Sequence, residues 1–346
     1  MQIGIGLDPT LGLSFEQHRE MAREAVRLGY DSMWTPAGLG VDAFHVCAQW
    51  WGASAEVVSG GLPTGISVVP VPYWTAVQLA ATAGTVGLLT GGRFILGIGS
   101  GPIHEESQRQ RFALPAYPPV GMMRDYLMAV RGLLAGESVE HSGPAVTLHG
   151  ARLGFRPPRV PVYLGALGPQ MVKLSGAQSD GVLLNWCTPE QIAWSRGVVA
   201  EGARAAGRDP GSVQVVEYIR VCVDDDEDAA RRAFTRAMMG YALARPGANK
   251  ALSYRGHFAR MGFGDALSDL ESRRDRGASD AEVIEAFPRD LLRSVGYYGS
   301  AAGAAAEFRR LAKGLDVAIV RVVPARPGPE TALATMQACR PELTAH

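Results

Sequence analysis

TGGRFILGIGSG, from Thr90 to Gly101, is the stretch of this sequence that decides the fold. It predicts a tight turn at Gly91-Gly92, a buried strand over Arg93–Ile98, and a glycine-dense exit. A short apolar run of this kind is typical of a parallel strand whose C-terminal end lets a second backbone or a flat ligand come close. The same glycines equally suit a strand packed at a narrow barrel interior. The stretch does not match the dinucleotide fingerprint, because no acidic residue follows at the required distance and no helix starts on its last glycine.

The composition excludes several function classes. The 346 residues include 34 basic and 34 acidic side chains, so the chain has no electrostatic footprint for nucleic acid or an anionic membrane. A small neutral or mixed-charge molecule is the expected partner. The cysteines are scattered without paired spacing, which argues against a disulfide framework or a zinc site. The N-terminus lacks a signal-peptide pattern and no run reaches the roughly 18 apolar residues of a membrane span, so we expect a cytoplasmic protein.

Strand and helix patterns alternate along most of the chain. Ser14, for example, stands at an N-cap position with Gln17 at the capping-box position, and Gly29 closes that helix. Eight strand–helix units predict an α/β protein with a (β/α)8 TIM barrel. The predicted strands are 3–7, 32–34, 64–69, 93–98, 160–164, 181–185, 213–223 and 317–323, and the predicted helices are 14–28, 43–58, 75–89, 122–134, 169–178, 189–206, 300–313 and 329–339.

Two segments interrupt this alternation. Residues 102–158 combine a polar, then proline-rich stretch, too long for an ordinary connection, with a helix and a hairpin pattern over Val139–Leu153. Residues 229–292 have a helical composition broken by glycine-containing pieces, and we expect them to cover the barrel mouth. The acidic run Asp224–Asp228 before them predicts the start of a solvated helix rather than a metal site. The chain is thus expected to form a single TIM-barrel domain over 1–346 with insertions at about 102–158 and 229–292.

In a barrel of this kind the functional site lies at the C-terminal ends of the strands. The residues to weigh there are Leu7-Asp8, Thr35-Pro36, Ser67–Pro70, Ser100-Gly101, Gly165–Gly168, Asn185-Trp186, Glu217–Arg220 and Arg321.

Three segments carry a resemblance to a known family. TGGRFILGIGSG, the segment VPVYLGALGPQMVKLSGAQSDGVLLNW (Val160–Trp186) and EGARAAGRDP (Glu201–Pro210) resemble the bacterial luciferase-like superfamily. Within it they are similar to the coenzyme F420-dependent oxidoreductases related to methylenetetrahydromethanopterin reductase. The likeness runs from Ile3 to Pro324, and its middle segment is the most specific part. It implies a TIM barrel with insertions, a flavin-like ring at the strand ends, and hydride transfer at a ring carbon.

The residues and the resemblance agree on where the cofactor would sit. The turn Gly165–Gly168 joins a strand to a helix with Pro169 in its first turn, so free backbone N–H groups there suit a phosphate, although an ordinary βα turn has the same spacing. The resemblance further implies a non-proline cis peptide at Ser67-Val68 whose bulge backs the ring. The predicted cofactor-binding residues are Ser67, Val68, Ser100, Gly101, Gly165, Ala166, Leu167, Gly168, Gln170 and Met171.

The catalytic residues depart from those of similar enzymes. Related sugar-phosphate and alcohol dehydrogenases carry a histidine after the second strand and a glutamate after the glycine-rich strand, where this chain has Trp34-Thr35-Pro36-Ala37 and Pro102. The nearby His104 and Glu105 are the predicted acid or base, because a loop next to the ring can bring such a group within reach; a solvated charged loop is the alternative. His45 is interpreted as packing or surface. Trp34, Thr35, Asn185 and Trp186 are the predicted substrate wall, although large aromatic residues also serve as simple core.

The function expected from these features is hydride transfer between coenzyme F420 and a small organic substrate. An FMN-dependent luciferase-like monooxygenase is the alternative, and a non-catalytic flavin-binding protein is a more distant one. We further expect a homodimer with no nucleic-acid or membrane partner.

Overall fold

Eight parallel strands close into a barrel in the computed structural model, which describes residues 1–7, 9–103, 105–246, 248–251 and 253–341. Strand β9 pairs with β11 on one side and with β8 on the other, and this second pairing closes the sheet. The predicted (β/α)8 barrel is therefore confirmed. The strands of the barrel are β1 (Gln2–Gly6), β2 (Ser32–Thr35), β3 (Thr64–Pro70), β4 (Phe94–Gly99), β7 (Val162–Gly165), β8 (Gly181–Asn185), β9 (Gln214–Val223) and β11 (Val317–Val322).

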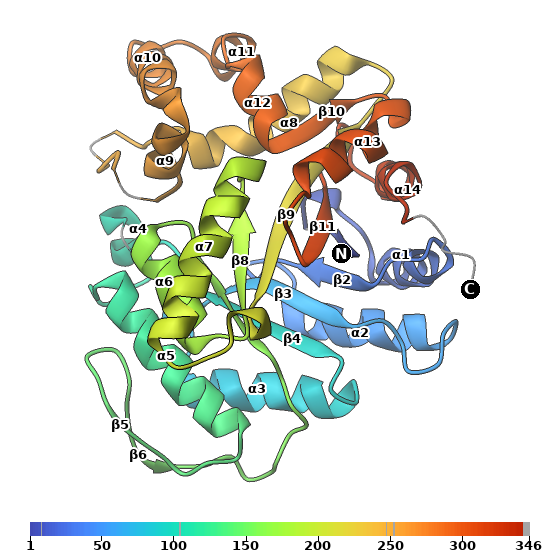
Figure 1. The fold of residues 1–346 in the computed structure, drawn as a ribbon. Helices are drawn as coiled ribbons and strands as arrows, with labels where there is room; N and C mark the ends of the chain where they lie inside the picture. The colour runs from blue at the N-terminus through green and yellow to red at the C-terminus, as the bar shows by residue number, and fades with distance from the viewer. Residues whose placement is uncertain (8, 104, 247, 252, 342–346) are drawn as a thin grey trace.

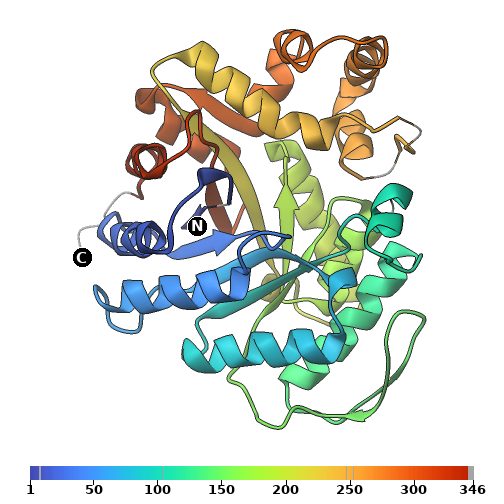
Figure 2. The ribbon, with the colours of Figure 1, turned by 180° about the vertical axis from the view of Figure 1, so that it is seen from behind.

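Helices surround the barrel, as Figures 1 and 2 show from opposite sides. The predicted capping box at the first of them is present: the Gln17 N–H donates to Ser14 Oγ at 3.2 Å, and the Ser14 N–H donates to Gln17 Oε1 at 2.8 Å. The enclosing helices are α1 (Phe15–Arg27), α2 (Ala43–Ala55), α3 (Ala76–Leu89), α5 (Pro119–Leu134), α6 (Pro169–Gln178), α7 (Pro189–Ala205), α13 (Ala301–Leu311) and α14 (Pro329–Ala338), with short helical turns η1 (Pro9–Leu11), η2 (Val71–Tyr73) and η3 (Pro210–Ser212).

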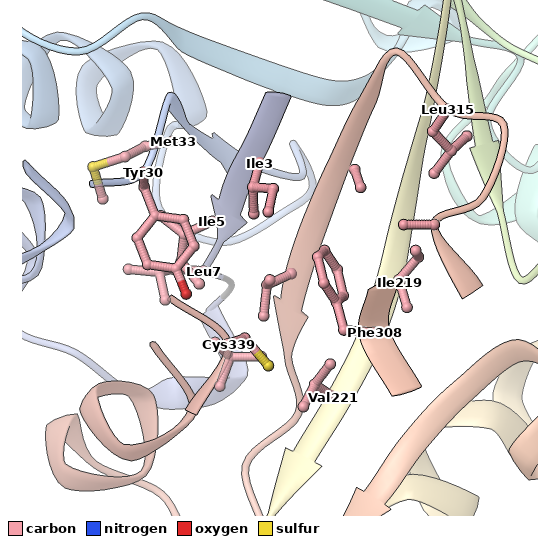
Figure 3. Packing of buried hydrophobic residues seen from close by; sticks show 14 of the residues in the cluster. Ile3, Ile5, Leu7, Tyr30, Met33, Ile219, Val221, Phe308, Leu315 and Cys339 are labelled. Carbon is pink, nitrogen blue, oxygen red and sulfur yellow. The ribbon is translucent and has the colours of Figure 1, made fainter. Parts of the chain in front are cut away.

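Each barrel strand has two buried faces, because parallel strands in a barrel are covered on both sides. On β9, Val216 and Tyr218 belong to the cluster inside the barrel, whereas Ile219 and Val221 pack outward. Figure 3 shows Ile219 and Val221 facing Phe308 of α13, within the layer between the strands and the helices. This alternation puts Tyr218 and its neighbours on the axis that leads to the barrel mouth.

The segment between β4 and β7 leaves the barrel pattern. It contains the short helix α4 (Glu106–Arg111) and the antiparallel hairpin β5 (Val139–Ser142) with β6 (Thr147–Ala151). The hairpin projects from the bottom of the molecule in Figures 1 and 2.

A group of helices follows β9 and gathers at the top of Figures 1 and 2. Its members are α8 (Glu227–Ala242), α9 (Ser253–Phe258), η4 (Ala259–Phe263), α10 (Gly264–Asp275), α11 (Asp280–Glu285) and α12 (Arg289–Val295). The acidic run does begin a helix, because Asp226 caps α8 by accepting from the Ala229 N–H at 3.0 Å. These helices have their own apolar cluster around Phe234, Phe258 and Leu291.

The strand β10 (Gly296–Gly299) follows this group and was not expected from the sequence. It pairs in parallel with the last residues of β9, from Arg220 to Val223. Four residues, of which the first and last are glycine, are too short a pattern to identify a strand. In the part of the chain that the structure describes, no helix is long and apolar enough to cross a membrane.

Candidate functional site

A cavity of about 560 Å³ opens at the C-terminal ends of the barrel strands. This size lies within the usual range for small-molecule sites. We call it the barrel cavity. Its walls come from the ends of β3, β4, β7, β8 and β9, and from the segment around α9. The ten residues predicted to bind a cofactor all line it: Ser67, Val68, Ser100, Gly101, Gly165, Ala166, Leu167, Gly168, Gln170 and Met171.

A bulge on β3 forms part of the cavity floor. The Ser67-Val68 peptide bond is cis, as the resemblance implied, and the pairing of β3 with β4 shifts register between Ile66 and Val69. The Val68 side chain packs against two glycines: an added Cβ would lie 2.6 Å from Val68 Cγ2 at Gly99 and 3.1 Å from Val68 Cγ1 at Gly165. Glycine at these positions lets Val68 stand on the floor between the strands.

The glycines of the opening stretch therefore serve both purposes that the sequence left open. An added Cβ at Gly97 would lie 2.1 Å from the Ile66 carbonyl oxygen, so Gly97 is required for packing between strands. Gly101, with φ of 56°, lines the cavity directly.

The N-terminus of α6 faces the cavity and offers unused backbone donors. Gly168 is the N-cap and Pro169 follows it. Val172 is the first residue whose N–H donates back into the helix, to the Gly168 carbonyl at 2.9 Å, so the N–H groups of Gln170 and Met171 have no acceptor within the helix. An added Cβ at Gly168 would have no atom within 4 Å. This end of the cavity suits an anionic group such as a phosphate.

Tyr218 supplies a polar group to the cavity floor. The residue is 4% exposed, and its hydroxyl makes no hydrogen bond within the described part of the chain. The Arg321 guanidinium lies 4.9 Å from the centre of the Tyr218 ring, and burial lowers the pKa of Arg321 to about 9. A buried hydroxyl without a partner is costly, so a polar edge of a bound ligand would complete this site. A flat ring with hydrogen-bonding atoms on its edge fits these surroundings.

A second cavity of about 710 Å³ adjoins the first. We call it the insertion cavity, because it is lined by α4 on one side and by residues between α8 and α9 on the other. Gly101, Ser253 and Tyr254 line both cavities, so the two spaces meet at these residues.

The predicted acid or base residues belong to this second region. Glu105 lines the insertion cavity rather than the barrel cavity, occupies the N-cap position of α4 without a side-chain hydrogen bond to the helix, and forms an ion pair with Arg245 at 3.4 Å. His104 lies outside the described residues. His45 is on the surface, as interpreted from the sequence, and its Nδ1 lies 2.7 Å from Asp42 Oδ1.

Of the predicted substrate wall, Asn185 lines the barrel cavity, whereas the structure places Trp34, Thr35 and Trp186 in the core. Trp34 is fully buried inside the barrel, where its Nε1 donates to Ser32 Oγ at 2.8 Å and its ring fills the space beside Gly65. The Trp186 side chain is also fully buried and packs edge-on against Phe234. For these residues the alternative interpretation as core is the one that the geometry supports, because strands buried on both faces place large aromatic residues in packing positions.

A buried carboxyl group supports the wall behind Asn185. Glu217 has no solvent exposure, and its Oε1 accepts from the Cys187 N–H at 2.7 Å. Burial raises the pKa of Glu217 to about 8, so the side chain is held mainly in its neutral form at pH 7. Next to it, His257 Nε2 lies 2.9 Å from the Trp186 carbonyl oxygen, and burial lowers the pKa of His257 to about 4.

Tyr218, Tyr254 and Arg260 are among the residues that line the barrel cavity but were missing from the predicted site. Tyr218 lies in the strand-end range Glu217–Arg220 that the sequence indicated. The alternation of inward and outward side chains along β9 is the signal that could have identified it as a cavity residue. Tyr254 and Arg260 belong to the helical insertion, which was expected to cover the barrel mouth, but the sequence did not indicate which of its side chains would reach the cavity. Among the described residues, no group of three or more histidine, cysteine, aspartate or glutamate side chains forms a metal site.

Comparisons with known proteins agree with this geometry. The chain is 38% identical over 161 residues to 5,10-methylenetetrahydromethanopterin reductase of Methanolobus tindarius, covering 46% of this chain and 48% of the relative. It is 33% identical over 174 residues to the reductase of the same name from Archaeoglobus fulgidus, covering 50% and 51%. The chain thus matches about half the length of these two relatives.

Similarity in structure extends over almost the whole chain. The solved structure of the coenzyme F420-dependent tetrahydromethanopterin reductase from Methanopyrus kandleri has a TM-score of 0.77 at 21% identity, with 97% of each chain covered. At this identity the likeness shows the shared barrel fold. The model of the luciferase-like monooxygenase family matches residues 1–318. The chain therefore belongs to the luciferase-like monooxygenase family, as the sequence segments indicated.

Proposed function

We propose that this protein is an oxidoreductase that binds coenzyme F420 in the barrel cavity and transfers a hydride between it and a small organic substrate. The observation that carries the proposal is the convergence of a glycine-lined floor, an unpartnered buried hydroxyl at Tyr218 and the N-terminus of α6 in one cavity. A relative from Mycobacterium tuberculosis named as a putative coenzyme F420-dependent oxidoreductase, 28% identical over 313 residues and covering 84% of this chain, supports the choice of cofactor.

The residues of the cavity divide the work of holding such a molecule. Val68 and the glycines around it would back the flat ring, and the Tyr218 hydroxyl would donate to the ring edge. The N–H groups of Gln170 and Met171 would bind the phosphate. Arg260 lines the same cavity and donates to the Leu167 carbonyl at 3.5 Å, so its positive charge lies beside the phosphate end. When bound, the deazaflavin ring supplies a carbon that accepts or donates the hydride.

The substrate approaches from the insertion cavity, because that space meets the barrel cavity where the ring would be exposed. Asn185 remains part of the proposed substrate wall. Glu105 remains a proposed acid or base at the rim, although its ion pair with Arg245 must open before its carboxylate can turn toward a substrate. We also propose that the protein forms a homodimer and acts in the cytoplasm.

Titration by fluorescence quenching tests the choice of cofactor. F420 and FMN are each titrated into the purified protein under the same conditions, and we expect F420 to bind at least about tenfold more tightly, a difference of about 1.4 kcal/mol. Tighter binding of FMN by that factor would overturn the proposal. The monooxygenase alternative would then predict substrate-dependent oxygen consumption with reduced FMN, which an oxygen electrode measures.

A further inference from the structure

Tyr254 stands where the barrel cavity and the insertion cavity meet, and it lines both. Its ring packs edge-on against Tyr241, with 4.7 Å between ring centres. A substrate that enters from the insertion cavity must pass this side chain before it reaches the floor of the barrel cavity.

A chain of hydrogen bonds fixes the direction of the Tyr254 hydroxyl. Arg220 Nη1 donates to Asn185 Oδ1, and a guanidinium group has no acceptor, so this contact sets which end of the Asn185 amide faces Arg220. Asn185 Nδ2 is therefore turned toward Tyr254 and donates to its hydroxyl oxygen at 2.7 Å. Because the amide nitrogen can only donate, the Tyr254 oxygen is the acceptor and its own hydrogen points elsewhere.

Within the part of the chain that the structure describes, the hydrogen bond of this hydroxyl is the one it accepts from Asn185, and its own hydrogen is not donated to another group. Since Tyr254 lines both cavities, an acceptor on a bound substrate can meet it there. Burial raises the pKa of Tyr254, so the phenol keeps its proton through neutral pH.

Arg220 adds a positive charge behind this chain. Its guanidinium lies 3.7 Å from the centre of the Trp186 ring and 5.3 Å from that of Tyr241, and the residue is 5% exposed. Its hydrogen bond to Asn185 is to a neutral amide oxygen rather than to a carboxylate. The Glu217 carboxyl and the Tyr241 hydroxyl interact electrostatically with Arg220, and its buried positive charge also favours a negative charge on the oxygen of Tyr254 after it has lost its proton.

We propose that Tyr254 is the catalytic proton donor of the reaction and that Asn185 and Arg220 are positioning residues that aim its hydroxyl at a substrate with a polar C=O or C=N bond. This inference rests on the proposed function, which supplies the hydride from the reduced deazaflavin. The substrate carbon gains that hydride while its π bond to oxygen or nitrogen breaks. The Tyr254 O–H bond breaks at the same time, and its proton forms the new O–H or N–H bond. Water returns a proton to the phenolate, so the net change is addition of one hydride and one proton.

The test uses the full chain loaded with reduced F420 under nitrogen. The probes are cyclohexanone, benzaldehyde and 2-methyl-1-pyrroline, which represent a ketone, an aldehyde and an imine. We expect the wild type to reduce at least one of them, and Tyr254→Phe to lower kcat by at least about a hundredfold with little change in KM, since a positioned general acid contributes 10²–10⁴-fold. Quenching titration should show that Tyr254→Phe binds F420 within about twofold of the wild type, because the proposed F420 contacts exclude this hydroxyl.

Arg220→Met tests whether Arg220 positions the Tyr254 hydroxyl or only stabilises the fold. Loss of the guanidinium removes the donor that orients the Asn185 amide, so Arg220→Met should lower kcat at least about tenfold while KM and F420 affinity change less than about twofold, and Arg220→Lys should restore part of kcat. Tyr73→Phe is the matched control, since Tyr73 lies outside both cavities and packs edge-on against Phe112. It should leave kcat unchanged.

Three results would overturn the inference while leaving the cofactor proposal intact. They are a Tyr254→Phe variant that turns over within about threefold of the wild type, a loss of turnover in Glu105→Gln but not in Tyr254→Phe, and a wild type that binds F420 yet reduces none of the three probes. A wild type that does not bind F420 would instead refute the proposed function itself.

Discussion

The barrel cavity and the insertion cavity adjoin, yet they are built from different kinds of structure. The barrel cavity has a floor of strand ends, held by sheet pairing on both sides of each strand and by close contacts at Gly97, Gly99 and Gly165. The insertion cavity is enclosed by the short helix α4 and by the segment between α8 and α9, joined by the exposed ion pair of Arg245 with Glu105. The difference teaches that the sheet can hold a cofactor rigidly while the insertions are free to vary with the substrate.

We expect the largest effect from Gly168→Asp, because it should weaken binding of the cofactor in the barrel cavity. An aspartate fits here without a clash and is a favourable N-cap residue for α6, so the fold should be kept. Its carboxylate would, however, lie beside the phosphate, and like charges about 4 Å apart repel by roughly 4 kcal/mol at an effective dielectric of about 20. After screening, we expect F420 affinity to fall at least about a hundredfold in a quenching titration.

Gly168→Asn is the matched control for this prediction, because it adds nearly the same atoms without the charge. We expect the fold-loss of F420 affinity in the asparagine variant to be less than about one tenth of the fold-loss in the aspartate variant. If Gly168→Asp remains folded by circular dichroism and binds F420 like the wild type, the phosphate binds elsewhere.

Glu217→Gln sharpens the comparison on the side of the barrel cavity, because Glu217 holds the turn after Asn185. The pKa of Glu217 is raised from 4.5 to about 8, so between these values the folded state holds a proton that the unfolded state has lost. Wild-type stability should therefore fall by up to about 1.4 kcal/mol per pH unit across this window, and remain level below it. Glutamine keeps the acceptor for Cys187 and does not titrate.

Thermal unfolding from pH 5 to pH 8 measures this difference. We expect the melting temperature of Glu217→Gln to rise relative to the wild type as the pH increases. Parallel curves for the two proteins would show that Glu217 is ionised in the folded state.

Arg245→Met addresses the insertion cavity and should have the smallest effect. Exposed ion pairs contribute about 0–1 kcal/mol, so removal of the pair with Glu105 should change the free energy of unfolding by less than about 1 kcal/mol. F420 affinity should stay within about twofold of the wild type, because Arg245 does not line the barrel cavity. A tenfold loss of affinity would mean that the cofactor extends into the insertion cavity and that the division between the two regions is wrong.

The sequence was informative for the barrel cavity because its residues follow strands directly. Gly165–Gly168 and Ser100-Gly101 could be placed at the mouth once the alternation of strands and helices was recognised. Tyr254 could not be selected, because the insertion was expected to cover the mouth, but which of its side chains reaches the cavity depends on packing between α8, α9 and the barrel. For Trp34, the sequence predicted the position at a strand end but not the role of the side chain. Whether a tryptophan packs in the core or lines a pocket depends on neighbours such as Gly65, and no local sequence pattern reveals which neighbours it will have.

Hydrogen–deuterium exchange with and without F420 tests the location of the cofactor most directly. The N–H groups of Gln170 and Met171 have no acceptor within their helix, so binding of a phosphate there should slow their exchange. We expect protection in peptides that cover 165–172 and 66–70, and little change in peptides that cover 105–111. Protection confined to 105–111 and 244–251, in a sample whose fluorescence shows that F420 is bound, would contradict the assignment of the barrel cavity as the cofactor site.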